Sequence, residues 1–337
     1  MLSWVDTAAK GFRPVGIIAL LSFVPQAFIA AINLVPEYDE SIYLDISENL
    51  YRMGLPIVSY ESGIFFFQHP PLSFLFFSLP FVANLDYLVA YRAVSSVFAV
   101  GTVFLTFLLG RLVGGRRIAI LAAALLAFTP LFLAYSHSVY MDVILGFFLL
   151  LSAYFFLKAD EQGKGVFWLL SGISLGLALW VKYLAAIAVL AYLAHLFMRY
   201  RWSVARRRET YVLLGPALGL FLLWPVYGLA LDHQQFISEL VRWSTFGGNN
   251  LHDARVGVSL PEYGLRFLRS ISPPIVVLLV FAMVRKLLVA GRRPAKLQTF
   301  FPHWYLVIWI LFLALVMPIK DMRYLIPAIP WIGLAVA

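Results

Sequence analysis

The sequence contains no cysteine, and only 13% of its 337 residues are charged. The lack of cysteine excludes disulfide scaffolds, thiolate metal sites and cysteine nucleophiles. Soluble domains carry about 25% charged and roughly 45–50% apolar residues, whereas 62% of this chain is hydrophobic. So few charges cannot cover a water-facing surface, and so much apolar surface excludes a disordered chain. We therefore expect an all-α polytopic membrane protein.

Long charge-free runs indicate where the chain crosses the membrane. A hydrocarbon core about 30 Å thick needs a helix of roughly 20 residues. Ten runs are predicted spans: 14–36, 93–110, 118–141, 143–157, 165–181, 183–198, 210–231, 270–284, 297–319 and 324–337. One helix over 165–198 would be about 51 Å long at 1.5 Å per residue, so Lys182 is predicted to lie at a turn. The last run reaches residue 337 without a polar cap, and we expect the full protein to continue beyond this domain of residues 1–337.

The distribution of basic residues predicts the orientation. The charge-free stretch 62–85 contains His69 and three prolines, and we treat it as interfacial or re-entrant. With that assignment, every basic cluster falls on one face, which the positive-inside rule identifies as cytoplasmic together with the N-terminus. The formal net charge of +9 then reflects topology and contact with anionic membrane lipids in a plasma membrane. It gives no reason to expect nucleic acid as a partner.

Two extracytoplasmic loops are long enough to be functional, at 37–92 and 232–269. In the first, Ile42, Ile46 and Leu50 recur every four residues, with charged residues on the opposite side. This spacing predicts a short amphipathic helix lying in the membrane interface. Asp39 stands at its start, where it is either an N-cap or an acid held above the mouth of the bundle.

Several ionisable residues are predicted at the same face. Asp142 separates the third predicted span from the fourth, Lys182 separates the fifth from the sixth, and Arg323 follows the ninth. The second loop adds Asp253 and Arg255. Charges at membrane depth are expensive and mark functional sites by default, although Asp142 would also fit a solvated turn and Lys182 an interfacial anchor. Together, these cations and acids suit a phosphate-bearing substrate and a proton transfer.

Four motifs follow one another in a characteristic order: YDESIYLDISENL at 38–50, QHPPLSFLF at 68–76, LALWVKY at 177–183 and KDMRYLIPAIP at 320–330. This arrangement resembles the membrane glycosyltransferases of family 39, which have the GT-C fold. That family includes protein O-mannosyltransferases and the lipid A aminoarabinose transferases. The resemblance implies a polyprenyl-phosphate sugar donor, and transfer with inversion to a lipid, glycan or protein acceptor on the extracytoplasmic side.

The resemblance also implies roles for individual residues. The acidic motif of the family falls on Asp39 and Glu40, with Asp39 as the general base, and its second cavity acid falls on Asp142. The family's lysine near the donor phosphate falls on Lys182, and its late basic residue falls on Arg323. From the residues alone, Arg255 in the second long loop is an alternative to Arg323 for holding the phosphate with Lys182. The remaining two candidates, assigned to the acceptor or the loops, are His69 and Asp253.

One departure from the family concerns metal. The aminoarabinose transferases have a glutamate, associated with metal, before the corresponding proline, and this chain has Gln68 followed by His69. The metal site therefore does not carry over directly. A divalent cation stays a possible cofactor, with His69 as the candidate ligand.

Two other classes of protein are consistent with a polytopic chain. A transporter or flippase for lipid-linked saccharides would place ionisable residues near the membrane midplane and show repeated halves. A non-catalytic subunit of a cell-envelope assembly would not need the acidic pair after the first span. Here the charges gather at one rim, and the sequence shows no repeat, which favours an enzyme.

Overall fold

The computed structural model describes residues 2–32, 35–53, 65–85, 87–244, 259–271, 273–290, 297–317 and 321–336, and the regular secondary structure of this part of the chain is all helical. The α-helices are α1 (Leu2–Ile32), α2 (Tyr38–Met53), α3 (Leu72–Phe77), α4 (Leu79–Val82), α5 (Leu88–Gly114), α6 (Arg116–Ala127), α7 (Pro130–Tyr135), α8 (Met141–Gln162), α9 (Gly165–Val181), α10 (Ala186–Tyr200), α11 (Arg208–Ser244), α12 (Leu260–Ile271), α13 (Pro273–Ala290), α14 (Phe301–Leu315) and α15 (Ile329–Val336). Four 3-10 segments accompany them: η1 (Tyr183–Ala185), η2 (Arg201–Arg206), η3 (Leu297–Phe300) and η4 (Met322–Ala328).

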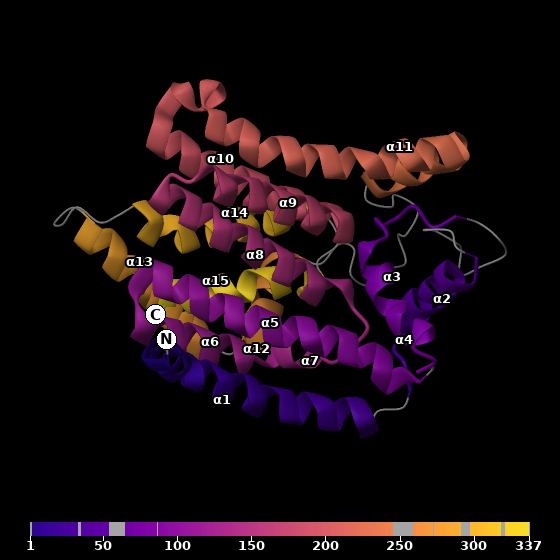
Figure 1. Cartoon of the computed structure of the whole chain (residues 1–337), viewed down its shortest axis with the longest axis horizontal. Coiled ribbons are helices and arrows are strands. Elements are labelled where there is room, and N and C mark those ends of the chain that lie inside the picture. Colours follow the sequence, from indigo (N-terminus) through magenta and orange to yellow (C-terminus); the bar gives the residue numbers. More distant parts are fainter. Residues whose placement is uncertain are drawn as a thin grey trace.

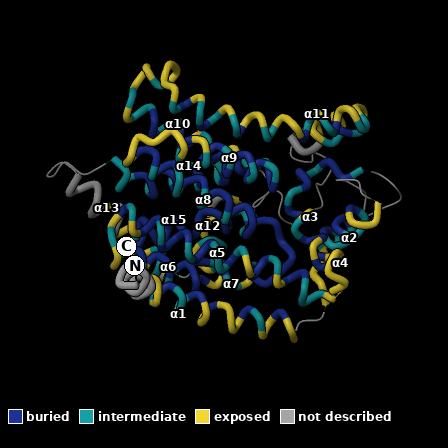
Figure 2. Tube along the Cα trace, viewed as in Figure 1, coloured by how far each residue is buried: buried dark blue, intermediate teal, exposed yellow. Residues whose placement is uncertain are grey.

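The long helices form a bundle with α8 near its centre. Helix α8 packs against both α5 and α9, while α1 and α11 lie on opposite outer sides (Figure 1). The short helices α2, α3 and α4 gather at one end of the bundle, and both chain termini lie toward the other end. Buried residues concentrate in the central helices, whereas α1 and α11 have long exposed stretches (Figure 2). Because the exposed residues of these outer helices are largely apolar, they fit a lipid-facing surface.

Close helix packing depends on glycine where α9 meets α11. A Cβ atom added at Gly172 would lie only 2.2 Å from the carbonyl oxygen of Leu213. A side chain of any size would therefore force the two backbones apart. Small residues at such contacts are typical of helix pairs in membranes, where the association depends on close van der Waals packing.

Within the described residues, six helices are long and apolar enough to cross a membrane. A seventh span is added if a pair of helices bent by 107° counts as one crossing. These seven overlap seven of the ten predicted runs. The other three runs form shorter or interrupted helices: 165–181 is 17 residues long, 324–337 contains the short α15, and 118–141 is divided between α6 and α7. Length and composition thus support a multi-pass protein with six or seven spans.

The predicted turn at Lys182 is present. Lys182 is extended, with φ −160° and ψ 137°, and it ends α9 before η1 begins. Helices α8 and α9 form a hairpin that is closed at Gly163, whose φ of +68° favours glycine. Asp142 at the start of α8 and Lys182 after α9 therefore lie at the same end.

The two long loops contain more helix than their length suggests. The first includes the predicted interfacial helix α2 and the short helices α3 and α4, and 72–82 is too short to cross the membrane. The second was expected to begin at residue 232, but α11 continues to Ser244 beyond a kink at Asp232. The Asp232 carboxylate accepts a hydrogen bond from the amide of Gln235 at 2.9 Å, which restarts the helix in the manner of an N-cap.

Candidate active site

Glu40 is the most completely buried carboxylate at the end of the bundle that carries α2. Its oxygens accept hydrogen bonds from Nε and Nη2 of Arg92 at 3.1 and 2.7 Å. They also accept hydrogen bonds from the amides of Glu37 at 2.9 Å and Val139 at 2.7 Å. Burial alone would raise the pKa of Glu40, but these bonds and the charge of Arg92 hold the pKa below its ordinary value. Glu40 therefore ties α2 to α5 and to the segment before α8.

The neighbouring Asp39 is in a different environment, because successive residues of a helix point about 100° apart. Its side chain is 21% exposed, and its Oδ2 accepts a hydrogen bond from Nη1 of Arg323. Asp321 also binds this arginine: its Oδ2 lies 2.9 Å from Nε, and its Oδ1 accepts from the Arg323 amide at 3.1 Å. The guanidinium lies 5.2 Å from the ring centre of Tyr140. Arg323 thus stands between two carboxylates and over an aromatic ring.

Asp142 and Lys182 form a second buried ion pair, with 2.8 Å between Oδ1 and Nζ. Both side chains are almost fully enclosed, and the other oxygen of Asp142 has no hydrogen-bond partner among the described residues. The ammonium also lies 4.5 Å from the ring centre of Tyr324. Burial lowers the pKa of Lys182, and the charge of Asp142 opposes this shift. Because Arg323 immediately precedes Tyr324, the two ion pairs lie side by side.

The position of Tyr43 shows that the two ion pairs lie in the same enclosed region of the protein. Its hydroxyl is enclosed and is within electrostatic range of Asp39, Asp142 and Arg323. The ring packs against that of Tyr140 at 6.1 Å in an edge-on arrangement. Residues from α2, α8, η4 and the end of α9 therefore converge, although Asp39 and Arg323 are 284 positions apart along the chain.

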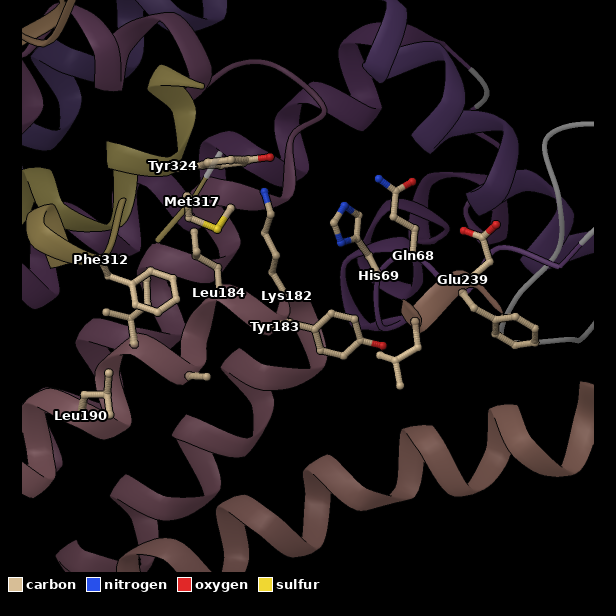
Figure 3. Close-up of a pocket in the computed structure, with 14 residues that line it drawn as sticks. Gln68, His69, Lys182, Tyr183, Leu184, Leu190, Glu239, Phe312, Met317 and Tyr324 are labelled. Carbon is tan, nitrogen blue, oxygen red and sulfur yellow. The ribbon is translucent and has the colours of Figure 1, made fainter. Parts of the chain in front are cut away.

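A cavity of about 460 Å³ opens beside Lys182 and has two chemically different ends. Figure 3 shows the Lys182 ammonium between the ring of Tyr324 and the imidazole of His69, with Gln68 and Glu239 nearby. The wall that leads away from these polar groups is apolar and comes from η1, α10, α11 and α14. Its main residues are Leu184, Ile187, Leu190, Leu240 and Phe312. A ligand with an anionic head and a hydrocarbon tail would match this lining.

His69 supplies a neutral polar group to the cavity. Burial, and then the positive charges of Lys182 and Arg323, hold the pKa of His69 well below its ordinary value of 6.5. Its Nδ1 is buried without a hydrogen-bond partner among the described residues. In the described part of the chain, no three His, Asp or Glu side chains are placed to hold a metal ion together. Within the described ranges, His69 therefore has no second and third metal-ligating side chain beside it.

The structure brings together most of the residues selected from the sequence: Asp39, Glu40, Asp142, Lys182, Arg323 and His69. Arg255 and Asp253 lie outside the described residues. Three contributors were missed, namely Arg92, Tyr140 and Asp321 as a partner of Arg323. Arg92 carried a usable signal, because it is a lone cation at the start of an apolar run, where a buried partner is expected.

Comparison with known proteins shows what this arrangement is similar to. Residues 68–228 match the model of the family described as dolichyl-phosphate-mannose-protein mannosyltransferase. The matched region includes His69, Arg92, Asp142 and Lys182. No curated protein matches the sequence.

Solved structures with a similar helical fold align with two thirds or more of the chain. ArnT from Cupriavidus metallidurans bound to undecaprenyl phosphate has a TM-score of 0.76 and 16% identity, with 96% of this chain and 59% of that chain covered. The archaeal oligosaccharyltransferase AglB from Archaeoglobus fulgidus, in complex with an inhibitory peptide and a dolichol-phosphate, has a TM-score of 0.60 and 16% identity, with 98% and 50% covered. The protein O-mannosyltransferase complex of S. cerevisiae, bound to the sugar donor, has a TM-score of 0.52 and 19% identity, with 67% and 34% covered.

These likenesses show the fold. The chain has the helical GT-C architecture expected from its motifs, and it spans 59% of the length of the ArnT chain.

Proposed function

We propose that this chain is the membrane domain of a glycosyltransferase that takes its sugar from a polyprenyl-phosphate donor. The observation that carries the proposal is the cavity with an apolar wall and a polar end at Lys182, directly beside the Asp39–Arg323 pair. The family match and the structures of relatives with undecaprenyl phosphate and dolichol-phosphate bound support the same substrate class.

In this proposal, the apolar wall holds the first prenyl units, and Lys182 and Arg323 hold the phosphate. Negative charge grows on the phosphate as the sugar leaves, so fixed cations stabilise the transition state more than the ground state. Both cations are nearly enclosed, where low dielectric strengthens their interaction with the leaving group. Arg255, in the second long loop, stays a predicted third contact.

The reaction is a single displacement. The acceptor hydroxyl gives its proton to the Asp39 carboxylate, and its oxygen attacks the anomeric carbon. The bond between that carbon and the phosphate oxygen breaks, the polyprenyl phosphate keeps the electron pair, and the configuration inverts. Asp39 is the suitable base because its side chain is 21% exposed, whereas Glu40 is buried and already accepts four hydrogen bonds. Glu40 then positions α2, and Asp142 holds Lys182 or orients the acceptor.

The site is proposed to face the extracytoplasmic side of the plasma membrane. The α8–α9 hairpin carries Lys158 and Lys164 at the end opposite Asp142 and Lys182. The positive-inside rule assigns that basic end, and with it the N-terminus, to the cytoplasm. The acceptor belongs to the lipids, glycans or proteins of the extracytoplasmic side. The ten-span topology remains part of this proposal.

Turnover of a labelled donor tests the proposal. Purified protein receives a panel of radiolabelled polyprenyl-phosphate sugars, and mass spectrometry identifies the product. We expect Asp39→Asn to lower transfer by about 10²–10⁴-fold, the usual contribution of a general base. Glu48→Gln, which removes an exposed carboxylate of the same helix, serves as the matched control and should keep normal turnover. Near-normal transfer by Asp39→Asn would disprove the base assignment, and a transporter or assembly subunit would consume no donor.

A further inference from the structure

Arg323 makes more contacts with carboxylates than an arginine that only binds a phosphate would need. Nη1 donates to Asp39, Nε is 2.9 Å from Asp321, and the backbone amide donates to the other oxygen of Asp321. The side chain of Arg323 is 9% exposed, so these ion pairs are only weakly screened by solvent. The two carboxylates differ in position, because Asp321 lies two residues from Arg323 and Asp39 is 284 residues away.

In this arrangement, Asp39 as the base and the donor phosphate compete for the same cation, Arg323. In this geometry Nη1 of Arg323 occupies Oδ2 of Asp39, so that oxygen is not free to receive the proton of an acceptor hydroxyl. The donor phosphate needs the same cation, and the planar fork of arginine binds a phosphate as readily as a carboxylate. With Asp321 beside Nε, a phosphate can bind two nitrogens of the fork only through Nη1 and Nη2, and Nη1 is the nitrogen now paired with Asp39.

We propose that Arg323 changes partners during the reaction cycle and that Asp321 is the positioning residue that holds it while it does so. Before the donor binds, Nη1 is paired with Asp39. When the donor binds, its phosphate takes over the Nη end, and Asp39 is released to accept the proton of the acceptor hydroxyl. The base is therefore available only in the donor-loaded site, which makes donor binding precede productive acceptor binding. This inference rests on the proposed function, since it assumes a phosphate-linked donor at Arg323.

The central experiment measures binding of undecaprenyl phosphate, without sugar or acceptor, to the purified chain in detergent. Removing the competing carboxylate should tighten binding, so we expect the Kd of Asp39→Asn to be about tenfold lower than that of the unchanged protein. Glu48→Gln removes a carboxylate from the same helix at an exposed position and should leave the Kd unchanged. An equal or higher Kd for Asp39→Asn would overturn the exchange.

A double-mutant cycle identifies Arg323 as the shared cation, because such a cycle isolates the coupling between two residues. In an Arg323→Gln background, Asp39→Asn should change the Kd by less than twofold. A persistent tenfold effect would show that Asp39 repels the phosphate from a distance rather than competing for Arg323. Arg323→Lys, which keeps the charge and removes the fork, gives a second test if the glutamine variant does not fold, and it should weaken binding about tenfold. An unchanged Kd would contradict the exchange.

Asp321→Asn tests the positioning residue. Its amide oxygen can still accept from the Arg323 amide, so the cap of η4 is preserved while the charge is removed. Of the two carboxylates that the described residues place on the guanidinium, Asp39 alone then remains, and the Kd ratio between Asp39-containing and Asp39→Asn proteins should rise above tenfold. An unchanged ratio would show that Asp321 does not share the cation, since a merely structural loss would affect both proteins equally. Donor turnover, measured separately, distinguishes failure of the proposed function from failure of the exchange.

Discussion

Replacing Glu40 with glutamine should destabilise the protein far more than any exposed carboxylate on the same helix. Glu40 is fully buried and receives four hydrogen bonds, two of them from Arg92. Glutamine has nearly the same shape, but it carries no charge, and its NH2 group cannot accept a hydrogen bond. The substitution therefore removes the Glu40 charge from beside the buried Arg92 cation, and at least one of the four donors loses its present acceptor.

The expected loss follows from the burial of the pair. Removing one partner of a buried ion pair costs about 3–5 kcal/mol. For a chain of this size, we expect the midpoint of thermal unfolding to fall by about 5–10 °C. Glu48→Gln is the matched control, because the Glu48–Arg52 pair has side-chain exposures of 35% and 64%, and exposed pairs at this spacing contribute only about 0.3–0.5 kcal/mol.

Thermal unfolding of both variants in one detergent, followed by intrinsic tryptophan fluorescence, measures the difference. A third protein, with Glu40→Leu and Arg92→Met together, should lose less stability than the sum of the two single losses, because neither charge is then left alone. Equal midpoints for Glu40→Gln and Glu48→Gln would refute the reasoning, since the Glu40–Arg92 pair could then not be buried as the structure has it.

Three further predictions follow from the same geometry. Because the folded-state pKa of Glu40 is lowered from 4.5, its stabilising contribution is present above pH 4.5 and is lost as the pH falls below that value. The unfolding midpoint, measured from pH 6 to pH 3, should therefore fall less steeply in Glu40→Gln than in the unchanged protein. Parallel curves for the two proteins would contradict this prediction. Lys182→Ala should raise the KM for the donor at least tenfold and leave that for the acceptor within twofold, because the ammonium lines the donor cavity; equal changes in steady-state assays would count against a phosphate role. Gly172→Ala should lower the free energy of unfolding by about 1–3 kcal/mol, because the added Cβ would lie 2.2 Å from the Leu213 carbonyl oxygen. Gly215→Ala on α11 has nothing within 4 Å of the added atom and should leave the melting midpoint unchanged in the same assay.

The membrane character and the end-of-bundle site were predictable for a local reason. Apolar runs and single charges are properties of short segments, and the hairpin turn at Lys182 follows from the length of one charge-free stretch. The number of spans was harder to predict from the sequence. The run 118–141 is charge-free, but the chain leaves the helix near Phe128 and begins another at Pro130, and hydropathy carries no trace of that break.

By itself, the sequence determined the class of protein, the chemical groups available and the end of the bundle at which they gather, because these depend on composition and on spacing along one helix. Only the tertiary structure decided which of two adjacent carboxylates is buried and which stays accessible. Asp39 and Glu40 have nearly the same neighbours in sequence, and their difference arises from partners 284 and 52 residues away. Such partners are brought together by packing of the whole bundle, and no local pattern records that packing.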